Sequence, residues 1–96
     1  MAKGYIIAHL TLINPDRFVS EYASKIAAIV ESFEGKFLVK GGKVSYSEED
    51  KADLDVVVEF PDIGAVHTCL SSNSYKEIAA GRTENTTGPF MAVEGV

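Results

Sequence analysis

The sequence predicts an α+β fold that runs strand, helix, strand, strand, helix, strand and forms a four-stranded antiparallel sheet with both helices on one face. Two kinds of signal predict it. Glycines bracket the apolar segment at residues 36–40 and mark the ends of a strand. Proline-containing helix starts at residues 14–16 and 61–62 are each followed by apolar residues at helical spacing.

Size and composition indicate one small folded domain over residues 1–96. The apolar share of 46% and the charged share of 24% are typical of a soluble globular protein. A net charge of -5 argues against nucleic acid as a partner, since phosphates require clusters of lysine and arginine. No apolar run reaches membrane-spanning length, and the start lacks the apolar stretch of a secretion signal. We therefore expect no membrane partner. Because the lone Cys69 cannot form an intramolecular disulfide, we also expect a cytoplasmic protein.

Residues 4–13 are expected to form the first strand. Side chains alternate between the two faces of a strand, so consecutive residues divide into two sets. One set is Ile6, Ala8, Leu10 and Leu12, and the other is Tyr5, Ile7, His9, Thr11 and Ile13. Both sets are largely apolar, which predicts a core strand covered on both faces.

The first helix is expected to begin at Pro15 and to end at Gly35. The side chain of Asn14 can cap free backbone amides, Pro15 suits the first helical position, and Asp16 favours the positive end of the helix dipole. Apolar residues then recur at helical spacing: Phe18, Tyr22, Ile26, Ile29, Val30 and Phe33. Gly35 is expected to close the helix as a left-handed cap.

The second and third strands are expected at 37–40 and 54–60. Between them, Gly41 and Gly42 permit the positive backbone angles of a bulge or tight turn, and residues 43–47 can continue the second strand past that kink. Three consecutive valines in the third strand indicate burial on both sides.

The second half of the chain is expected to supply a divided helix and the last strand. Pro61 and Asp62 begin the helix, the polar run at 71–74 interrupts it, and Ser72 can cap a further short helix that Gly81 closes. Residues 82–88 are expected to form a polar loop, and residues 89–96 the last strand.

Two helices can cover only one face of a four-stranded sheet. If Ile6 and Leu10 face the helices, then Tyr5, Ile7 and His9 lie on the bare side, which is too apolar to face water comfortably. Large exposed apolar patches on soluble domains mark interaction surfaces. We therefore expect a homodimer in which a second copy packs sheet to sheet about a two-fold axis.

Polar residues on the bare face are the first candidates for function. They are His9, Thr11, Lys40, Asp55, Glu59 and Glu94. A bulge at Gly41 or Gly42 would reverse the alternation and move some of them to the helical side. Spacing alone does not decide which of them share a cavity.

Several segments in a fixed order resemble one known family over essentially the whole chain. They are Lys3-Gly4-Tyr5, Pro15-Asp16-Arg17-Phe18 with Tyr22, the segment Gly35-Lys36-Phe37-Leu38-Val39-Lys40-Gly41-Gly42, Glu59-Phe60-Pro61, Ser72-Asn73-Ser74-Tyr75, Arg82 and Val93-Glu94-Gly95. In these segments the chain resembles the small bacterial proteins grouped as domain of unknown function 1330.

The resemblance implies a ferredoxin-like fold of the dimeric α+β barrel type, which agrees with the bare-face argument. Relatives of that barrel include small oxygenases, chlorite dismutase-like haem proteins and muconolactone isomerase-like enzymes, but a shared fold transfers no reaction. This sequence departs from the family pattern at two places. Lys40 stands where the family usually has arginine, and Cys69-Leu70 replaces an aromatic pair.

Each candidate residue has a functional and a structural interpretation. His9 can be a general base, a haem or metal ligand, or a structural histidine, and Glu59 can be a base or the partner of a cation. Lys40 and Arg82 can hold an anionic substrate or can pair with Glu59 and Glu94. The Tyr22 ring is expected in the core with a hydroxyl that can reach the cavity, and Cys69 is expected as a packed thiol.

These residues lead to a first hypothesis and two others. The first is a dimer that binds or transforms a small, partly apolar carboxylic acid in a pocket between sheet and helices, lined by His9, Lys40, Glu59 and Arg82. If it is an enzyme, fold analogy favours cofactor-independent oxygenation or isomerisation. The alternative is a non-catalytic sensing or assembly module whose cavity residues only stabilise the dimer. The third hypothesis is haem binding through His9, and no other residues in the sequence support it. We therefore expect neither a cofactor nor a metal.

Overall fold

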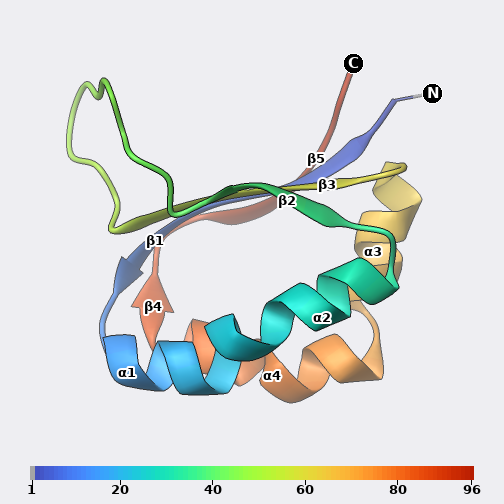
Figure 1. Cartoon of the computed structure of the whole chain (residues 1–96), viewed down its shortest axis with the longest axis horizontal. Coiled ribbons are helices and arrows are strands. Elements are labelled where there is room, and N and C mark those ends of the chain that lie inside the picture. The colour runs from blue at the N-terminus through green and yellow to red at the C-terminus, as the bar shows by residue number, and fades with distance from the viewer. Residues whose placement is uncertain (1) are drawn as a thin grey trace.

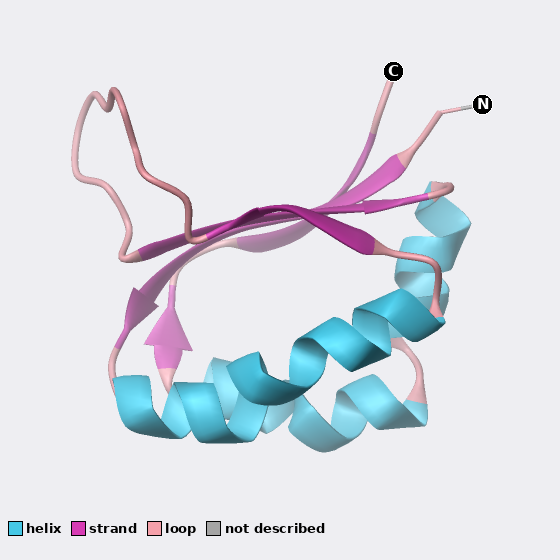
Figure 2. Cartoon of the chain, in the orientation of Figure 1, coloured by secondary structure: helices cyan, strands magenta, loops and turns pink. Residues whose placement is uncertain are grey.

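The computed structural model describes residues 2–96, which form a sheet with helices packed against one of its faces (Figure 1). The elements are β1 (Gly4–Leu12), α1 (Pro15–Phe18), η1 (Val19–Ala23), α2 (Ser24–Ser32), β2 (Lys36–Lys40), β3 (Leu54–Phe60), α3 (Ile63–Leu70), α4 (Asn73–Thr83), β4 (Thr86–Thr87) and β5 (Phe90–Glu94). Coloured by secondary structure, all the helices lie on the same side of the strands (Figure 2). The predicted α+β order is confirmed.

The sheet is antiparallel and has β1 at its centre. Its order is β2-β3-β1, and both β4 and β5 pair with the free side of β1. The fourth predicted strand is therefore broken in two: β5 pairs with the first half of β1, where Ile6 lies opposite Ala92, and β4 pairs with its end, where Leu12 lies opposite Thr86. Between these pieces, the carbonyl of Pro89 accepts a hydrogen bond from the amide of His9 at 3.0 Å.

The alternation predicted for β1 decides where the core forms. Ile6, Ala8 and Leu10 are buried beneath the helices, while His9 and Thr11 are exposed on the opposite face. The buried apolar cluster joins β1 and β3 to every helix, and its members are Ile6, Ala8, Leu10, Phe18, Tyr22, Ile26, Val30, Val58, Phe60, Val66, Cys69, Tyr75 and Ile78. The opposite face of the sheet, which we call the open face, has no helix against it (Figure 1).

The helix that follows β1 differs from its prediction at both ends. Its first residue is Pro15, but the side chain of Asn14 makes no cap and instead donates a hydrogen bond to Asn85 at 3.2 Å. The left-handed residue near its C-terminus is Glu34, with φ 65°, and not Gly35. Gly35 is required for another reason, because a Cβ there would lie 2.6 Å from Cγ1 of Val30.

The edge strand β2 is bulged, but not at the predicted glycines. Its register with β3 shifts between Phe37 and Val39, so the extra residue is Leu38. Gly41 does take a positive φ of 70°, and it turns the chain away from the sheet. The prediction that residues 43–47 continue the strand is wrong, since they belong to a loop over residues 41–53 that extends on the side away from the helices (Figure 1).

The predicted start of α3 at Pro61-Asp62 and the predicted cap of α4 at Ser72 are confirmed. The side chain of Asp62 accepts a hydrogen bond from the amide of Ala65 at 2.8 Å, and the hydroxyl of Ser72 accepts one from the amide of Tyr75 at 3.2 Å. Such caps satisfy backbone donors that have no partner inside the helix. A turn at Ser71 and Ser72 therefore separates the two short helices, and the cap at Ser72 begins the second one.

Gly81 does not close α4, which continues to Thr83. The glycine instead allows α4 to approach η1, because a Cβ at Gly81 would lie 2.8 Å from the backbone carbon of Glu21. In an ordinary helix position, alanine is more favourable than glycine. Here the close approach of the α4 and η1 backbones requires glycine at position 81.

We expect Gly81→Ala to lower the free energy of unfolding by about 1–3 kcal/mol, the usual cost of overpacking. Urea denaturation followed by circular dichroism measures it. Lys76→Ala, at an exposed position of the same helix, is the control and is expected to change stability by less than about 0.5 kcal/mol. A Gly81→Ala protein as stable as the wild type would show that the helices are not in close contact here.

Candidate functional site

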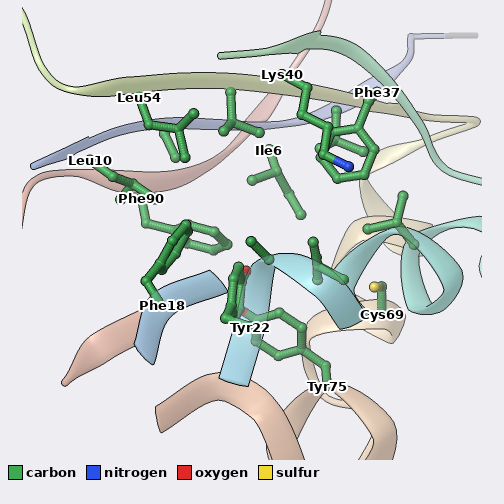
Figure 3. Close-up of a pocket in the computed structure, with 16 residues that line it drawn as sticks. Ile6, Leu10, Phe18, Tyr22, Phe37, Lys40, Leu54, Cys69, Tyr75 and Phe90 are labelled. Carbon is green, nitrogen blue, oxygen red and sulfur yellow. The ribbon is translucent and has the colours of Figure 1, made fainter. Parts of the chain in front are cut away.

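A cavity of about 50 Å³ lies between the sheet and the helices. It is lined by Ile6, Ala8, Leu10, Phe18, Tyr22, Ala23, Ile26, Val30, Phe37, Lys40, Leu54, Val56, Val58, Cys69, Tyr75 and Phe90. Figure 3 shows the rings of Phe18, Tyr22 and Tyr75 on the helical side and Ile6 and Leu54 on the sheet side. The wall is therefore almost wholly apolar, and any polar group in it selects what can bind.

Lys40 is the charged residue among the described residues that line this cavity. Because its side chain both lines the cavity and is exposed, Lys40 lies where the cavity opens to solvent. Its Nζ atom lies 4.9 Å from the centroid of the Phe37 ring, within cation–π range (Figure 3). Among the ion pairs found between residues 2 and 96, none involves Lys40.

The bulge in β2 explains why Lys40 points into the cavity. Residues three apart in a regular strand face opposite sides of the sheet. Because Leu38 is an extra residue in the strand, the side chains of Phe37 and Lys40 point to the same side of the sheet. Phe37 lies opposite Val58, and Lys40 lies opposite Val56. The sequence left open that a bulge at Gly41 or Gly42 moves some polar residues to the helical side. The bulge lies at Leu38 instead, and it moves Lys40.

Two tyrosines and an arginine form a hydrogen-bonded chain in the wall. The hydroxyls of Tyr22 and Tyr75 are 3.0 Å apart, and Nε of Arg82 donates to the Tyr75 hydroxyl at 3.3 Å. The guanidinium of Arg82 also lies 3.8 Å from the centroid of the Phe90 ring. Arg82 therefore acts on the cavity through Tyr75 and Phe90, which line it, and does not itself line it.

Tyr22 sits in the π-helical turn η1, a feature often associated with functional sites. Burial raises the pKa of its hydroxyl far above the usual value, and the hydrogen bond with Tyr75 adds to this. Burial likewise raises the pKa of the Cys69 thiol. Both groups therefore keep their protons at neutral pH, and Cys69 is the packed thiol that the sequence predicts.

His9 and Glu59 lie outside this cavity, so the prediction that they line it with Lys40 and Arg82 is wrong. The β1–β3 register explains it, because Glu59 faces Tyr5 and Asp55 faces His9, all on the open face. Glu59 Oε1 lies 3.9 Å from Nζ of both Lys3 and Lys36. Glu59 is thus the partner of cations, one of its two predicted interpretations.

His9 forms a pair with Asp55 instead. Its Nδ1 atom lies 2.8 Å from Oδ1 of Asp55, directly across the β1–β3 ladder. Sequence reasoning placed both residues on the bare face but missed their contact, because it had no cross-strand register. Tyr75, which the cap at Ser72 positions at the start of α4, lines the apolar cavity.

Within residues 2–96, no group of three or more histidine, cysteine, aspartate or glutamate side chains is arranged to hold a metal ion. No helix in the same part of the chain has the length and apolar character needed to cross a membrane.

The sequence matches the family described as Domain of unknown function (DUF1330) over residues 3–96. The chain belongs to this family. A search of curated proteins gave no match. The antiparallel strand order and the helices on one face confirm the ferredoxin-like fold that the resemblance implied, and solved structures share it.

Solved structures of the same fold include proteins of varied description. A protein of unknown function from Rhodopseudomonas palustris is 14% identical with a TM-score of 0.72, covering 99% of this chain and 83% of its own. SnoaB, a cofactor-independent oxygenase from Streptomyces nogalater, is 19% identical with a TM-score of 0.66, covering 97% and 92%. An ethyl tert-butyl ether d (EthD) family protein from Bacillus halodurans is 14% identical with a TM-score of 0.58, covering 100% of both. At these identities the likeness shows the fold alone.

The raised pKa of Tyr22 predicts an alkaline loss of stability. The pKa of Tyr22 in the folded protein lies above the ordinary tyrosine value of 10.0. The stabilisation from the protonated hydroxyl is therefore complete below pH 10 and is lost as the pH rises from there. We expect the free energy of unfolding to fall by up to about 1.4 kcal/mol per pH unit above that point. Urea denaturation at pH 8, 10 and 11 measures it, and the loss should be smaller in Tyr22→Phe. An equal loss in both proteins would contradict the assignment to Tyr22.

Proposed function

We propose that this DUF1330 protein binds a small, partly apolar carboxylic acid in the cavity between sheet and helices. The observation that carries the proposal is an apolar cavity with Lys40 at its opening, a lysine that forms no ion pair with any residue the structure describes. The apolar part of the ligand occupies the cavity, and its carboxylate lies against Nζ of Lys40. The resulting complex buries the hydrocarbon of the ligand and leaves its carboxylate near water, so that little free energy is lost in removing the charge from solvent.

The size of the cavity limits the ligand. A cavity of roughly 150 Å³ accommodates benzene, whereas this one measures about 50 Å³. A short aliphatic acid such as isobutyrate therefore suits the present side-chain arrangement better than an aromatic acid. Because Lys40 is exposed, its ion pair with a carboxylate contributes only about 1 kcal/mol or less, so selectivity depends on both parts of the ligand.

Binding is favoured over acid–base catalysis by the groups in the wall. None of the described lining residues is a carboxylate or an imidazole, and Tyr22 and Cys69 hold their protons. The fold shared with SnoaB transfers no oxygenation chemistry at this identity. The remaining alternative is an assembly module whose cavity binds nothing, and the ligand test below separates the two.

Isobutyrate is expected to raise the melting temperature of the wild type and to lose this effect in Lys40→Met. The methionine keeps the apolar stem but removes the charge that holds the carboxylate. Differential scanning fluorimetry over an isobutyrate series measures the shift, and isothermal titration calorimetry confirms the site.

Lys36→Met is the matched control, because Lys36 lies on the same strand but faces Glu59 on the open side. Arg82→Ala is expected to weaken binding indirectly through Tyr75. Equal shifts in the wild type, Lys36→Met and Lys40→Met would rule out the anion site and favour the assembly module.

We further propose that a second copy of the chain covers the apolar part of the open face. That face carries an apolar patch across four strands, made of Tyr5, Ile7, Val39, Val57, Met91 and Val93. Within the described chain, no helix lies against this patch (Figure 1). Two such patches related by a two-fold axis cover each other, which supports a homodimer. A fully buried single thiol, Cys69, supports a reducing, cytoplasmic location.

Val93→Asp is expected to convert the dimer to a monomer, because a buried unpaired carboxylate at the interface costs several kcal/mol. Size-exclusion chromatography with light scattering should give twice the chain mass of 10.3 kDa for the wild type and the single-chain mass for the variant. Val19→Asp adds the same charge to an exposed helical position and should stay dimeric. A wild-type monomer at micromolar concentration would overturn the proposal.

A further inference from the structure

A second, larger hollow lies on the other side of the sheet. It measures about 490 Å³, is open to solvent, and is lined by residues from the end of β1 and from the 41–53 loop. This loop extends from the open face (Figure 1). Strand residues His9, Thr11 and Asp55 form its floor, and loop residues Ser47, Asp50 and Lys51 form part of its side. We call this hollow the loop groove. It shares no lining residue with the apolar cavity.

The His9–Asp55 pair fixes the chemistry of the groove floor. A carboxylate only accepts hydrogen bonds, so the Nδ1 atom of His9, 2.8 Å from Oδ1 of Asp55, carries the proton of the neutral ring. The other nitrogen, Nε2, is then an acceptor. It has no hydrogen-bond partner among residues 2–96, and the His9 side chain is half exposed to the groove. This is the arrangement of an imidazole that is oriented by a carboxylate and available to a ligand.

Stabilising the sheet does not require this pair. The strands β1 and β3 are already joined by a continuous ladder from Gly4 opposite Phe60 to Leu10 opposite Leu54. A partly exposed ion pair adds about 1 kcal/mol or less to such a ladder. The pair therefore contributes more to the orientation of the ring than to the stability of the fold.

The charges around the groove select the sign of a ligand. Asp50 and Asp55 contribute two negative charges and Lys51 one positive charge, so the lining carries a net charge of one negative unit when His9 is neutral. An anion is disfavoured here, whereas a cation that also donates hydrogen bonds matches both the charge and the Nε2 acceptor. We infer that the loop groove is a second ligand site, for a small primary amine whose ammonium group donates to Nε2 of His9.

The first test is the tautomer of His9. Long-range proton–nitrogen NMR spectra of the labelled protein above pH 7 are expected to show a protonated Nδ1 and a free Nε2 for His9. His67, the other histidine, is exposed on α3 and serves as an internal reference. In Asp55→Ala the His9 ring should lose this preference. A proton on Nε2 of His9 in the wild type would overturn the proposal.

The second test is a titration with ethanolamine. We expect saturable shifts of the amide signals of Thr11, Ser47 and Gly88, and no such shifts with isobutyrate. His9→Asn retains a donor at the position of Nδ1 but removes the acceptor at Nε2, so it should weaken binding about five- to tenfold. His67→Asn is the matched control and should bind like the wild type.

The outcome is independent of the proposed carboxylic acid site. Lys40→Met should bind ethanolamine normally, because Lys40 faces the other side of the sheet. Failure of isobutyrate binding alone would remove the cavity proposal and leave the groove intact. Absence of saturable shifts with ethanolamine, or equal binding by His9→Asn, would remove the groove proposal.

Discussion

The one-sided packing of the sheet is the constraint on which the rest of this structure depends. The helices bury one set of side chains from β1, including Ile6 and Leu10, and leave the other set without cover. A single alternation of side chains thus creates two surfaces with different chemistry. The inner surface forms the core and the apolar cavity. The outer surface holds an apolar patch and, beyond it, the polar pair of His9 and Asp55.

Much of the fold could be predicted from the sequence because the deciding signals are local. The strand alternation around Ile6 and Leu10, the start at Pro15, and the caps at Asp62 and Ser72 each depend on residues within a few positions of one another. The two predictions about helix ends, at Gly35 and Gly81, were wrong for a reason that is not local. The ring of Phe60 leaves no room for a Cβ atom at Gly35, and the backbone of Glu21 leaves none at Gly81. Local reasoning has no access to these distant neighbours and interprets both glycines as helix ends.

The candidate site could be predicted only in part, for a related reason. Lys40, Arg82 and Tyr22 do lie in or next to the cavity, but the bulge at Leu38 that turns Lys40 inward has no glycine to mark it. The sequence wrongly predicts that His9 and Glu59 line the cavity, because it gives the identity of each residue but not its partner on the neighbouring strand. The register determines the partners of both residues, Asp55 for His9 and a pair of lysines for Glu59. The register also places His9 opposite Asp55 in the lining of the loop groove.

The bulge also distinguishes two lysines that are chemically identical. Lys36 and Lys40 lie four residues apart in β2, a spacing that places side chains on the same face of a regular strand. The extra residue at Leu38 sends them to opposite faces, where Lys36 meets Glu59 and Lys40 meets no acid among the described residues. In a chain with a net charge of -5, an anion is repelled in general and is attracted only where a cation is unpaired. A single backbone irregularity thus makes one lysine a structural partner and leaves the other available to a ligand.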